Sequence, residues 1–373
     1  MKIKVLSVFG TRPEALKMAP VLMEMSRHAD KVISKCCVTA QHRKMLDQVL
    51  GLFDIAPDYD LDLMTSDQSL SDLASRIFVK LALVIKKEKP EWALVQGDTT
   101  TVMVASLVAQ YNGVKVGHVE AGLRSGDKFQ PFPEEINRRV VGVTADLHFV
   151  PTEKARENLL KENVPSDRIV VTGNSIIDAV HWIIKKPYDI SKGPLKGIPP
   201  GKRIVLVTAH RRENFGKPLR EICGALKEIA QTFQDVHLVY PVHLNPHVKK
   251  PVYELLKGVD HITLLPPLDY QPFIHLMSRS YLILTDSGGI QEEAPSFGIP
   301  VLVLRNKTER PEGVKAGASK LVGTDQRRIV AEAKKLWNDM GAYQSMAKTI
   351  NPYGDGHAAQ RIVRALINFG KRN

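Results

Sequence analysis

The chain alternates short apolar runs with longer amphipathic stretches along its whole length. The short runs are rich in β-branched residues, which favours strands, and the stretches between them repeat apolar positions at helical spacing. The predicted strands of the first half are Lys4–Phe9, Val32–Val38, Trp92–Gln96, Val116–Glu120, Leu147–Val150 and Ile169–Thr172. Those of the second half are Arg203–Thr208, Val236–Tyr240, Ile262–Leu265, Tyr281–Thr285 and Val301–Leu304. This pattern predicts an α/β fold with parallel sheets covered by helices on both faces.

The alternation is interrupted once, which indicates two domains in tandem. Residues 186–202 read KPYDISKGPLKGIPPGK, and this richness in proline, glycine and lysine predicts a linker. We therefore expect one domain over 1–185 and another over 203–356, with a last helical pattern from His357 to Phe369. Ligands of open α/β sheets bind beyond the carboxyl ends of the strands, so the cleft between two such domains is the expected site.

Composition and charge narrow the possible functions. The 373 residues exceed one domain of about 100–200 residues. The 52 Lys and Arg against 40 Asp and Glu leave a net charge of +12, which suits an anionic ligand. The basic residues are scattered, which disfavours a dedicated nucleic-acid binder. The N-terminal apolar run, Val5 to Phe9, is short for a signal peptide, and no stretch reaches the roughly 18 apolar residues of a membrane span, so we expect a cytoplasmic protein.

Two metal-site patterns and one cofactor pattern are judged unlikely to be functional. An odd number of cysteines with two adjacent predicts buried apolar side chains rather than a disulfide framework or a zinc site; they are Cys36, Cys37 and Cys223. His243 and His247 have helical metal-ligand spacing, but Pro246 interrupts the helix and disfavours a metal site. The G-x-G-x-x-A match over residues 354–359 follows no strand, which favours a turn over a nicotinamide site.

The end of the first predicted strand has the features of an anion site. Thr11 and Glu14 have the spacing of a capping box, which predicts that a helix begins there. Arg12 and Lys17 lie at or near this helix N-terminus, and two cations beside such an end favour an anion. An ordinary strand–turn–helix with solvated charges is the alternative.

A second candidate follows the strand that ends at Thr285. Ser287 can cap a helix, and Gly288 and Gly289 allow backbone N–H groups to approach a phosphate closely. The segment is neither a Walker loop nor a dinucleotide fingerprint. A diphosphate at the helix start, with ribose hydroxyls on Glu292 or Glu293, would fit, and a glycine turn required for packing is the alternative.

Ionisable residues also gather at predicted strand ends. Asp98 and Glu120 follow strands of the first domain, and Glu134 with Glu135 opens a helix. Carboxylates on opposite sides of a substrate would suit removal and return of a proton on its two faces. His210 follows the first strand of the second domain, where it could be an acid, a base or a phosphate ligand, or alternatively a structural histidine.

Taken together, eleven segments resemble the non-hydrolysing UDP-N-acetylglucosamine 2-epimerases, in order, from Lys2 to about Arg364. The segments are FGTRPEALKMAP, TAQHRKMLDQVL, QGDTTT, GHVEAGLRSGD, PFPEEINRR, TGNSIIDA, TAHRREN, PVHLNP, TDSGGIQEEAP, ERPEGVKAG and NPYGDG. The resemblance implies a glycosyltransferase-B type fold, in which two Rossmann-like domains face a central cleft and a terminal helix, 357–373, completes the first domain. It further implies a homodimer.

The resemblance also implies a reaction. Members of the family interconvert UDP-GlcNAc and UDP-ManNAc by anti elimination of UDP to 2-acetamidoglucal and syn re-addition, without a metal or nicotinamide cofactor. The product would supply ManNAc units for cell-surface polysaccharide. Two related activities remain as alternatives: a hydrolysing 2-epimerase that releases ManNAc and UDP, and a glycosyltransferase of the same fold.

Residue roles follow from the same resemblance, position by position. The implied catalytic residues are Asp98, Glu120, Glu134 and His210. The implied substrate contacts are Arg12 and Lys17 on the nucleotide side, Ser287, Gly288 and Gly289 at the diphosphate, Glu293 at the ribose, Arg310 at a phosphate and Phe273 beside the uracil. The implied activating site for a second UDP-GlcNAc comprises Gln41, His42, Gln68, Arg211 and His243. The chain departs from the family at Leu268, where a glutamine is common, and at Asp67, where some regulated members carry arginine.

Overall fold

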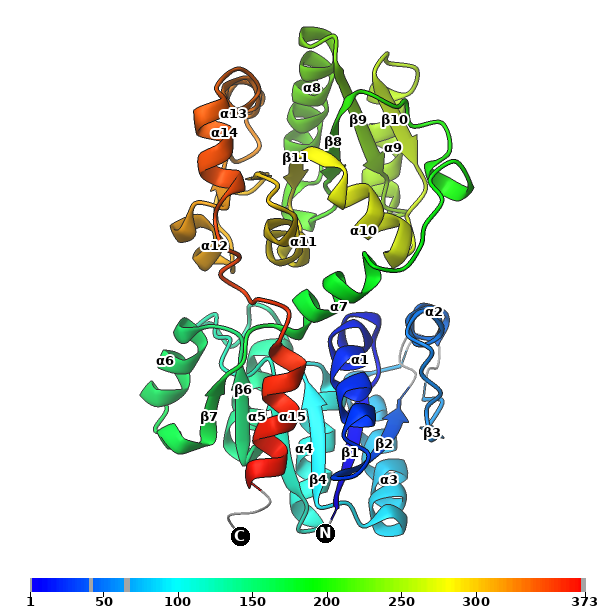
Figure 1. Ribbon diagram of the computed structural model, residues 1–373, viewed down its shortest axis with the longest axis vertical. Helices are drawn as coiled ribbons and strands as arrows, with labels where there is room; N and C mark the ends of the chain where they lie inside the picture. The colour runs from blue at the N-terminus through cyan, green and yellow to red at the C-terminus, as the bar shows by residue number, and fades with distance from the viewer. Residues whose placement is uncertain (1, 40–42, 64–67, 370–373) are drawn as a thin grey trace. The chain divides into compact units, whose positions relative to one another are not determined.

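The computed structural model describes residues 2–39, 43–63 and 68–369, and the chain divides into two compact units. The first unit comprises residues 1–179 and 354–373, and the second comprises residues 180–353. Each unit is a parallel β-sheet flanked by α-helices (Figure 1). The α/β prediction with two parallel sheets is therefore confirmed.

The first unit has a seven-stranded sheet in the order β3-β2-β1-β4-β5-β6-β7. Its strands are β1 (Ile3–Phe9), β2 (Val32–Val38), β3 (Tyr59–Asp60), β4 (Trp92–Gln96), β5 (Lys115–Val119), β6 (Leu147–Val150) and β7 (Ile169–Val171). Its helices are α1 (Arg12–Arg27), α2 (Arg43–Leu52), α3 (Leu70–Glu88), α4 (Thr100–Tyr111), α5 (Glu134–Thr144), α6 (Glu153–Lys161) and α15 (Ala358–Phe369), and α7 (Ser175–Ile183) runs on into the second unit. The strand order reverses between β1 and β4, the switch point where ligands of such sheets bind.

The second unit has a six-stranded sheet in the order β10-β9-β8-β11-β12-β13, with its own reversal between β8 and β11. Its strands are β8 (Arg203–Thr208), β9 (Val236–Pro241), β10 (Ile262–Leu265), β11 (Ser280–Thr285), β12 (Val301–Val303) and β13 (Ser319–Leu321). Its helices are α8 (Lys217–Thr232), α9 (Pro246–Leu256), α10 (Tyr270–Ser278), α11 (Gly288–Glu293), α12 (Pro311–Ala316), α13 (Gln326–Asn338) and α14 (Met340–Ala347). The segment 186–202 belongs to this unit, and within it Leu195 is completely buried.

Side chains on opposite faces of the first sheet explain how helices cover both sides. Leu6 and Val8 pack into a core with α3 and α4, and this core excludes water from that face. On the other face, a Cβ at Gly117 would lie 2.8 Å from Leu94 Cδ1 and 3.7 Å from Leu366 Cδ2 of α15. The absence of a side chain at Gly117 therefore makes room for the side chain of Leu94 on the neighbouring strand, and Leu366 of α15 packs over the same place at an ordinary contact distance.

The terminal helix α15 is fastened to the first unit at both ends. Asp178 accepts hydrogen bonds from the N–H groups of Ala358 (3.1 Å) and Ala359 (2.9 Å), so it satisfies two free donors at the helix N-terminus. Burial raises the pKa of Asp178 to about 6. At the other end, the rings of Trp92 and Phe369 pack edge to face at 5.4 Å. In Figure 1 this red helix accordingly lies against the unit that contains the N-terminal strand.

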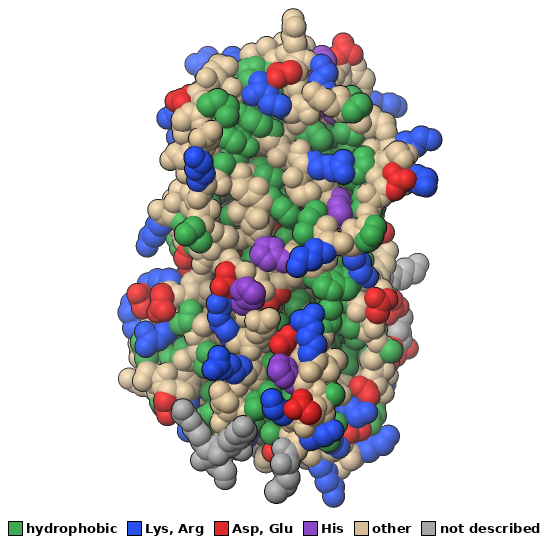
Figure 2. All heavy atoms as spheres, in the orientation of Figure 1, with side chains coloured by type: hydrophobic (Ala, Val, Ile, Leu, Met, Phe, Trp, Pro, Cys, Tyr) green, Lys and Arg blue, Asp and Glu red, His purple; other side chains and the backbone are tan. Residues whose placement is uncertain are grey.

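The predicted strands agree closely with the observed ones, and the differences have a physical cause. Trp92–Gln96 and Arg203–Thr208 match at both ends. The short strands β3 and β13 were not predicted, because runs of two or three residues at a sheet edge carry little periodicity. No helix in the part of the chain that the structure describes is long and apolar enough to cross a bilayer. Figure 2 shows basic side chains interspersed with acidic ones over the visible face of each unit.

Candidate active site

In the first unit, the candidate ionisable residues follow three neighbouring strands. Arg12 opens α1 after β1, Asp98 comes two residues after β4, and Glu120 directly follows β5. Because β1 pairs with β4 and β4 pairs with β5, all in parallel, these residues lie along one edge of the sheet. Glu134 is the first residue of α5.

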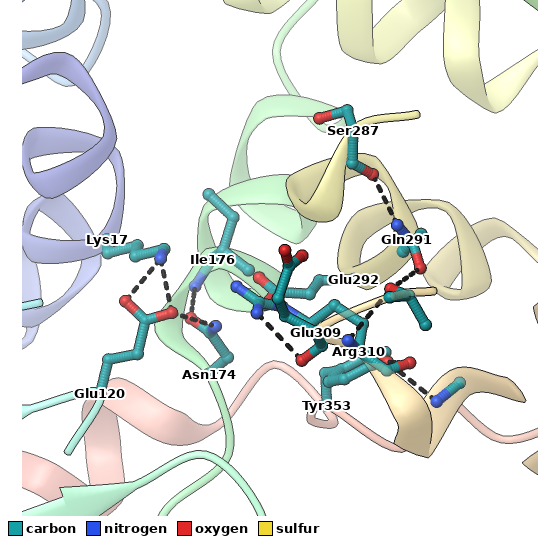
Figure 3. Close-up of polar contacts among 12 residues, drawn as sticks. Lys17, Glu120, Asn174, Ile176, Ser287, Gln291, Glu292, Glu309, Arg310 and Tyr353 are labelled. Carbon is teal, nitrogen blue, oxygen red and sulfur yellow. Dashed lines mark hydrogen bonds and ion pairs between the residues drawn. The ribbon is translucent and has the colours of Figure 1, made fainter. Parts of the chain in front are cut away.

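Glu120 accepts hydrogen bonds from more side chains than the other candidate carboxylates do. Lys17 Nζ lies 2.6 Å from Oε1 and 2.5 Å from Oε2, and Asn174 Nδ2 donates to Oε1 at 3.2 Å (Figure 3). Gln96 donates a further, short hydrogen bond to Oε2. Glu120 is buried and has φ 65°, a left-handed conformation that non-glycine residues adopt only when their surroundings enforce it. The side chain is thus held in one orientation by donors from α1, from β4 and from the loop before α7.

Asp98 is held by α5. Arg138 Nε donates to Asp98 Oδ2 at 2.8 Å, and Arg138 Nη2 lies 2.7 Å from the same oxygen. Asn137 Nδ2 donates to the backbone carbonyl of Asp98 at 2.8 Å. The side chain of Asp98 is 27% exposed, so this carboxylate is both fixed and accessible.

Glu134 and Arg12 in the first unit have polar atoms left for a ligand. Oε2 of Glu134 is buried and has no hydrogen-bond partner among residues 2–39, 43–63 and 68–369. Arg12 is partly buried, and its side chain forms no hydrogen bond or ion pair with another described residue. A buried carboxylate oxygen without a donor is costly unless a ligand or water serves it.

The turn that carries Arg12 is tightly built. Glu14 accepts the N–H groups of Gly10 and Thr11, both at 2.7 Å, which confirms the predicted capping box. A Cβ at Gly10 would lie only 1.9 Å from Thr39 Oγ1, so the close approach of β1 to this residue requires glycine. Burial raises the pKa of Glu14, while the hydrogen bond from Thr99 acts in the opposite direction.

In the second unit, the candidates gather at the switch point between β8 and β11. Asp286, which follows β11, accepts the N–H groups of His210 and Arg211 at 2.8 Å and Asn214 Nδ2 at 2.9 Å. Its other oxygen lies 3.6 Å from His210 Nδ1, and the His210 ring stacks on that of His243 at 5.3 Å. Burial lowers the pKa of His210; His243 and Arg211 act in the same direction and Asp286 opposes them. A neutral imidazole of this kind can accept a proton.

The glycine turn after Asp286 leaves its backbone open. A Cβ at Gly289 would meet no atom within 4 Å, and one at Gly288 would meet only Arg211 Nη2 at 3.7 Å. Arg211 Nε is buried and has no hydrogen-bond partner in the described part of the chain. Ser287 is the N-cap residue of α11, but its hydroxyl makes no capping hydrogen bond, so the expected capping by this side chain is wrong.

The two glutamates after the glycine turn have different surroundings. Glu292 forms a short ion pair with Arg310, as Figure 3 shows. Glu293 is buried and accepts a 3.3 Å hydrogen bond from Tyr270 at the start of α10. Phe273, also on α10, is partly buried.

The residues expected to bind a second nucleotide sugar are only partly described. Arg211 and His243 cluster with His210 in the second unit. Gln68, in the first unit, accepts a short hydrogen bond from Arg76. Gln41 and His42 lie outside the described residues.

Several residues that hold the candidates in place were missed by sequence reasoning; they are Gln96, Asn137, Arg138, Asn174 and Asp286. The rule that polar residues at strand ends converge could have found Gln96 and Asp286, which end or follow β4 and β11. The four-residue spacing of Glu134 and Arg138 on α5 places both on one helix face, but it suggests an ion pair between them, whereas Arg138 pairs with Asp98 and Glu135.

Comparisons with known proteins bear on the family of this chain. The family model described as UDP-N-acetylglucosamine 2-epimerase matches residues 24–367. The UDP-N-acetylglucosamine 2-epimerase of Yersinia pestis is 53% identical over 372 residues, which cover 98% of this chain and 99% of that protein. The crystal structure of UDP-GlcNAc 2-epimerase from Neisseria meningitidis bound to UDP-GlcNAc is 47% identical, has a TM-score of 0.88 and covers 98% of this chain and 100% of that one.

A more distant match bears on the fold alone. A glycosyltransferase structure from Rickettsia africae has 12% identity and a TM-score of 0.61, covering 100% of this chain and 97% of that chain. The architecture is therefore of the glycosyltransferase-B type. In sequence, the chain is 53% identical to the Yersinia pestis epimerase but only 12% identical to this glycosyltransferase. From these matches, the chain belongs to the UDP-N-acetylglucosamine 2-epimerase family.

Proposed function

We propose that the protein interconverts UDP-GlcNAc and UDP-ManNAc by inverting carbon 2 of the sugar. The observation that carries this proposal is the placement of Asp98, Glu120 and Glu134 in the first unit, two of them beyond adjacent parallel strands and the third at the start of α5. Inversion requires proton removal and return at one carbon, and carboxylates serve both steps. A relative from Neisseria meningitidis binds UDP-GlcNAc, and the proposal assigns the same ligand to this chain.

The chemistry proceeds by elimination because the hydrogen at carbon 2 is not beside a carbonyl group. A base takes that proton, the C–H electron pair forms the double bond between carbons 1 and 2, and the C1–O bond breaks with its electrons leaving on UDP. The intermediate is 2-acetamidoglucal. UDP then adds back at carbon 1 while a proton returns to carbon 2 on the opposite face. Groups that stabilise the negative charge developing on UDP should contribute strongly to the rate.

The proposed roles divide between the two units. In the first unit, Asp98, Glu120 and Glu134 exchange protons, and Arg12 and Lys17 bind the nucleotide side. In the second unit, His210 is catalytic, and the binding residues are Ser287, Gly288 and Gly289 at the diphosphate, Glu293 at the ribose, Arg310 at a phosphate and Phe273 beside the uracil. The open backbone at Gly289 supports the diphosphate assignment.

Two of the proposed phosphate-binding cations already have partners. Lys17 pairs with Glu120, and Arg310 pairs with Glu292. A diphosphate would therefore compete with a carboxylate for each of these cations. Arg12 has no such competitor among the described residues, and we infer that it makes the first contact with the incoming charge.

We further propose two properties that depend on more than one ligand or chain. The first is activation by a second UDP-GlcNAc, bound with the help of Gln41, His42, Gln68, Arg211 and His243. The clustering of Arg211 and His243 beside His210 supports a coupling between this ligand and the reaction.

The product of the proposed reaction, UDP-ManNAc, would supply ManNAc units for cell-surface polysaccharide.

The second property is a homodimer that uses the outer face of α3, α4 and α5. These helices pack side by side, and apolar side chains on them are unusually exposed: Val79 (66%), Leu83 (64%), Tyr111 (75%) and Val143 (87%). Val79 and Leu83 lie four residues apart on α3 and so share one helix face. An apolar patch that spans three helices is typical of an interaction surface, and we assign it to a second copy of this chain.

The reaction is tested by incubating the EDTA-treated protein with UDP-GlcNAc in deuterated water and following proton NMR. We expect UDP-ManNAc to appear with deuterium at carbon 2, and the remaining substrate to exchange at the same carbon, because the proton is lost and regained from solvent. Free ManNAc and UDP as the main products would instead indicate a hydrolysing enzyme. An unchanged substrate, converted only when a sugar acceptor is added, would indicate a glycosyltransferase.

The site assignment is tested with Asp98→Asn, Glu120→Gln, Glu134→Gln and His210→Asn. Each variant should lose about 100–10,000-fold in turnover, since each removes a group that exchanges a proton. Circular dichroism should show that the fold persists. Near-normal turnover in all four variants would contradict the assignment.

Activation is tested with pure UDP-ManNAc as the only substrate. We expect slow conversion that accelerates when a small amount of UDP-GlcNAc is added, and a sigmoidal dependence of rate on UDP-GlcNAc. A His243→Ala variant should lose the stimulation. Hyperbolic kinetics together with immediate conversion of UDP-ManNAc would refute the proposed activation.

The dimer surface is tested with the double variant Val79→Glu/Leu83→Glu in light scattering after size exclusion. The wild-type protein should have the mass of a dimer and the variant that of a monomer, because the introduced charges would have to be buried without partners. Ile350→Glu is the matched control, since Ile350 is 87% exposed in the second unit. A variant that remains dimeric would exclude this face as the interface.

A further inference from the structure

The carboxylate of Asp98 is bound through only one of its two oxygens. Arg138 directs Nε and Nη2 at Oδ2, at 2.8 and 2.7 Å. Oδ1 accepts no hydrogen bond from any residue that the structure describes. An arginine commonly binds both oxygens of a carboxylate with two parallel hydrogen bonds. Here both nitrogens contact Oδ2, so Oδ1 is available to another group.

Hydrogen bonds also fix the backbone next to Asp98. The orientation of its carboxylate therefore depends on the side-chain torsions of Asp98 alone. Asn137 Nδ2 donates to the Asp98 carbonyl at 2.8 Å. A ring nitrogen of His118, Nε2, lies 2.7 Å from the carbonyl oxygen of Gly97, and burial lowers the pKa of His118 to about 4. The neutral ring must therefore use its single N–H to donate to that carbonyl. Gly97 itself has φ 85°, which a residue with a side chain would adopt only under strain.

Arg138 is in turn held by a buried anion on its own helix. Nη1 lies 3.3 Å from Oε2 of Glu135, whose side chain is completely buried. Burial alone would raise the pKa of Glu135, but the N–H groups of Ser125 and Gly126 and the charge of Arg138 lower it overall. Arg138 thus joins the accessible carboxylate of Asp98 to a buried carboxylate that two backbone N–H groups hold in place, and these contacts restrict the orientation of the guanidinium.

The same helix carries a second proposed proton-exchanging group. Glu134 precedes Arg138 by four residues on α5, so the two side chains share one face of the helix. Glu134 Oε2 has no described partner, and Asp98 Oδ1 likewise accepts no bond. A shift of α5 would displace both carboxylates together.

We propose that Arg138 is a positioning residue, which holds Asp98 by one oxygen so that the other can exchange a proton with the sugar. The proposal rests on the proposed proton-transfer role of Asp98. Arg138 itself need not touch the substrate. Its effect should therefore appear in kcat rather than in KM, because orientation of the reacting group matters in the chemical step.

The test is a double-mutant cycle of Arg138→Gln and Asp98→Asn, assayed by deuterium incorporation at carbon 2 with long incubations. Arg138→Gln alone should lower kcat by about 10–100-fold with little change in KM. In the Asp98→Asn background the same substitution should change kcat by less than about 3-fold, because two residues that act as one unit are not additive. Arg138→Lys should recover part of the loss, since it keeps the charge and one donor.

The matched control is Arg139→Gln, on the next residue of α5. Arg139 is 54% exposed, and its one ion pair, with Glu135, is long at 3.6 Å. Its replacement should therefore leave kcat and thermal stability near wild type. Arg138→Gln with undiminished kcat, or with the same fold-loss in both backgrounds, would overturn the positioning role. Wild-type protein that fails to exchange the carbon 2 proton would instead refute the proposed reaction, so the two failures are distinguishable.

Discussion

The reversal of strand order in each sheet is the constraint on which the candidate site depends. In a parallel sheet all strands end at one edge, and where the order reverses, the connections leave in opposite directions and expose the loops that follow the strands. The reversal at β1 and β4 exposes the turns of Arg12 and Asp98, and that at β8 and β11 exposes His210 and the glycine turn after Asp286. Chemically different groups are thus brought to one edge of each sheet without any long-range sequence signal.

Carboxylates at the strand ends of each sheet require donors, and the way each is satisfied distinguishes their roles. Glu14 and Asp286 accept mainly backbone N–H groups and stabilise turns. Glu120 accepts side-chain donors, including Lys17, and Asp98 has one committed and one open oxygen. A carboxylate held by backbone donors stays fixed, because those donors cannot leave, and the other oxygen of Asp286 is buried 3.6 Å from His210 Nδ1. A carboxylate with an accessible oxygen or exchangeable partners can take part in chemistry.

Much of this arrangement could be anticipated from residue patterns, and the exceptions are instructive. The strand Trp92–Gln96 was located from its apolar run, and Asp98 and Glu120 were placed at strand ends on the same basis. The helix that opens at Glu134 was also expected. The hydroxyl of Ser287 was expected to cap a helix and does not. Capping requires a particular side-chain torsion, and the residue type alone does not determine that torsion. Arg138 was overlooked, since one arginine on a charged helix face resembles many others until its partner is known.

The sequence by itself determined the two α/β units, the loops in which the candidate groups lie and the family to which the chain belongs. These depend on local periodicity, turn chemistry and motif order, all of which are encoded along the chain. Only the tertiary structure decided which charged groups pair. Lys17 pairs with Glu120, which is 103 residues away along the chain, and Arg138 pairs with Asp98, which is 40 residues away. Such pairs depend on strand register and on how helices pack against the sheet, and these arise from contacts between distant elements rather than from the residues nearby.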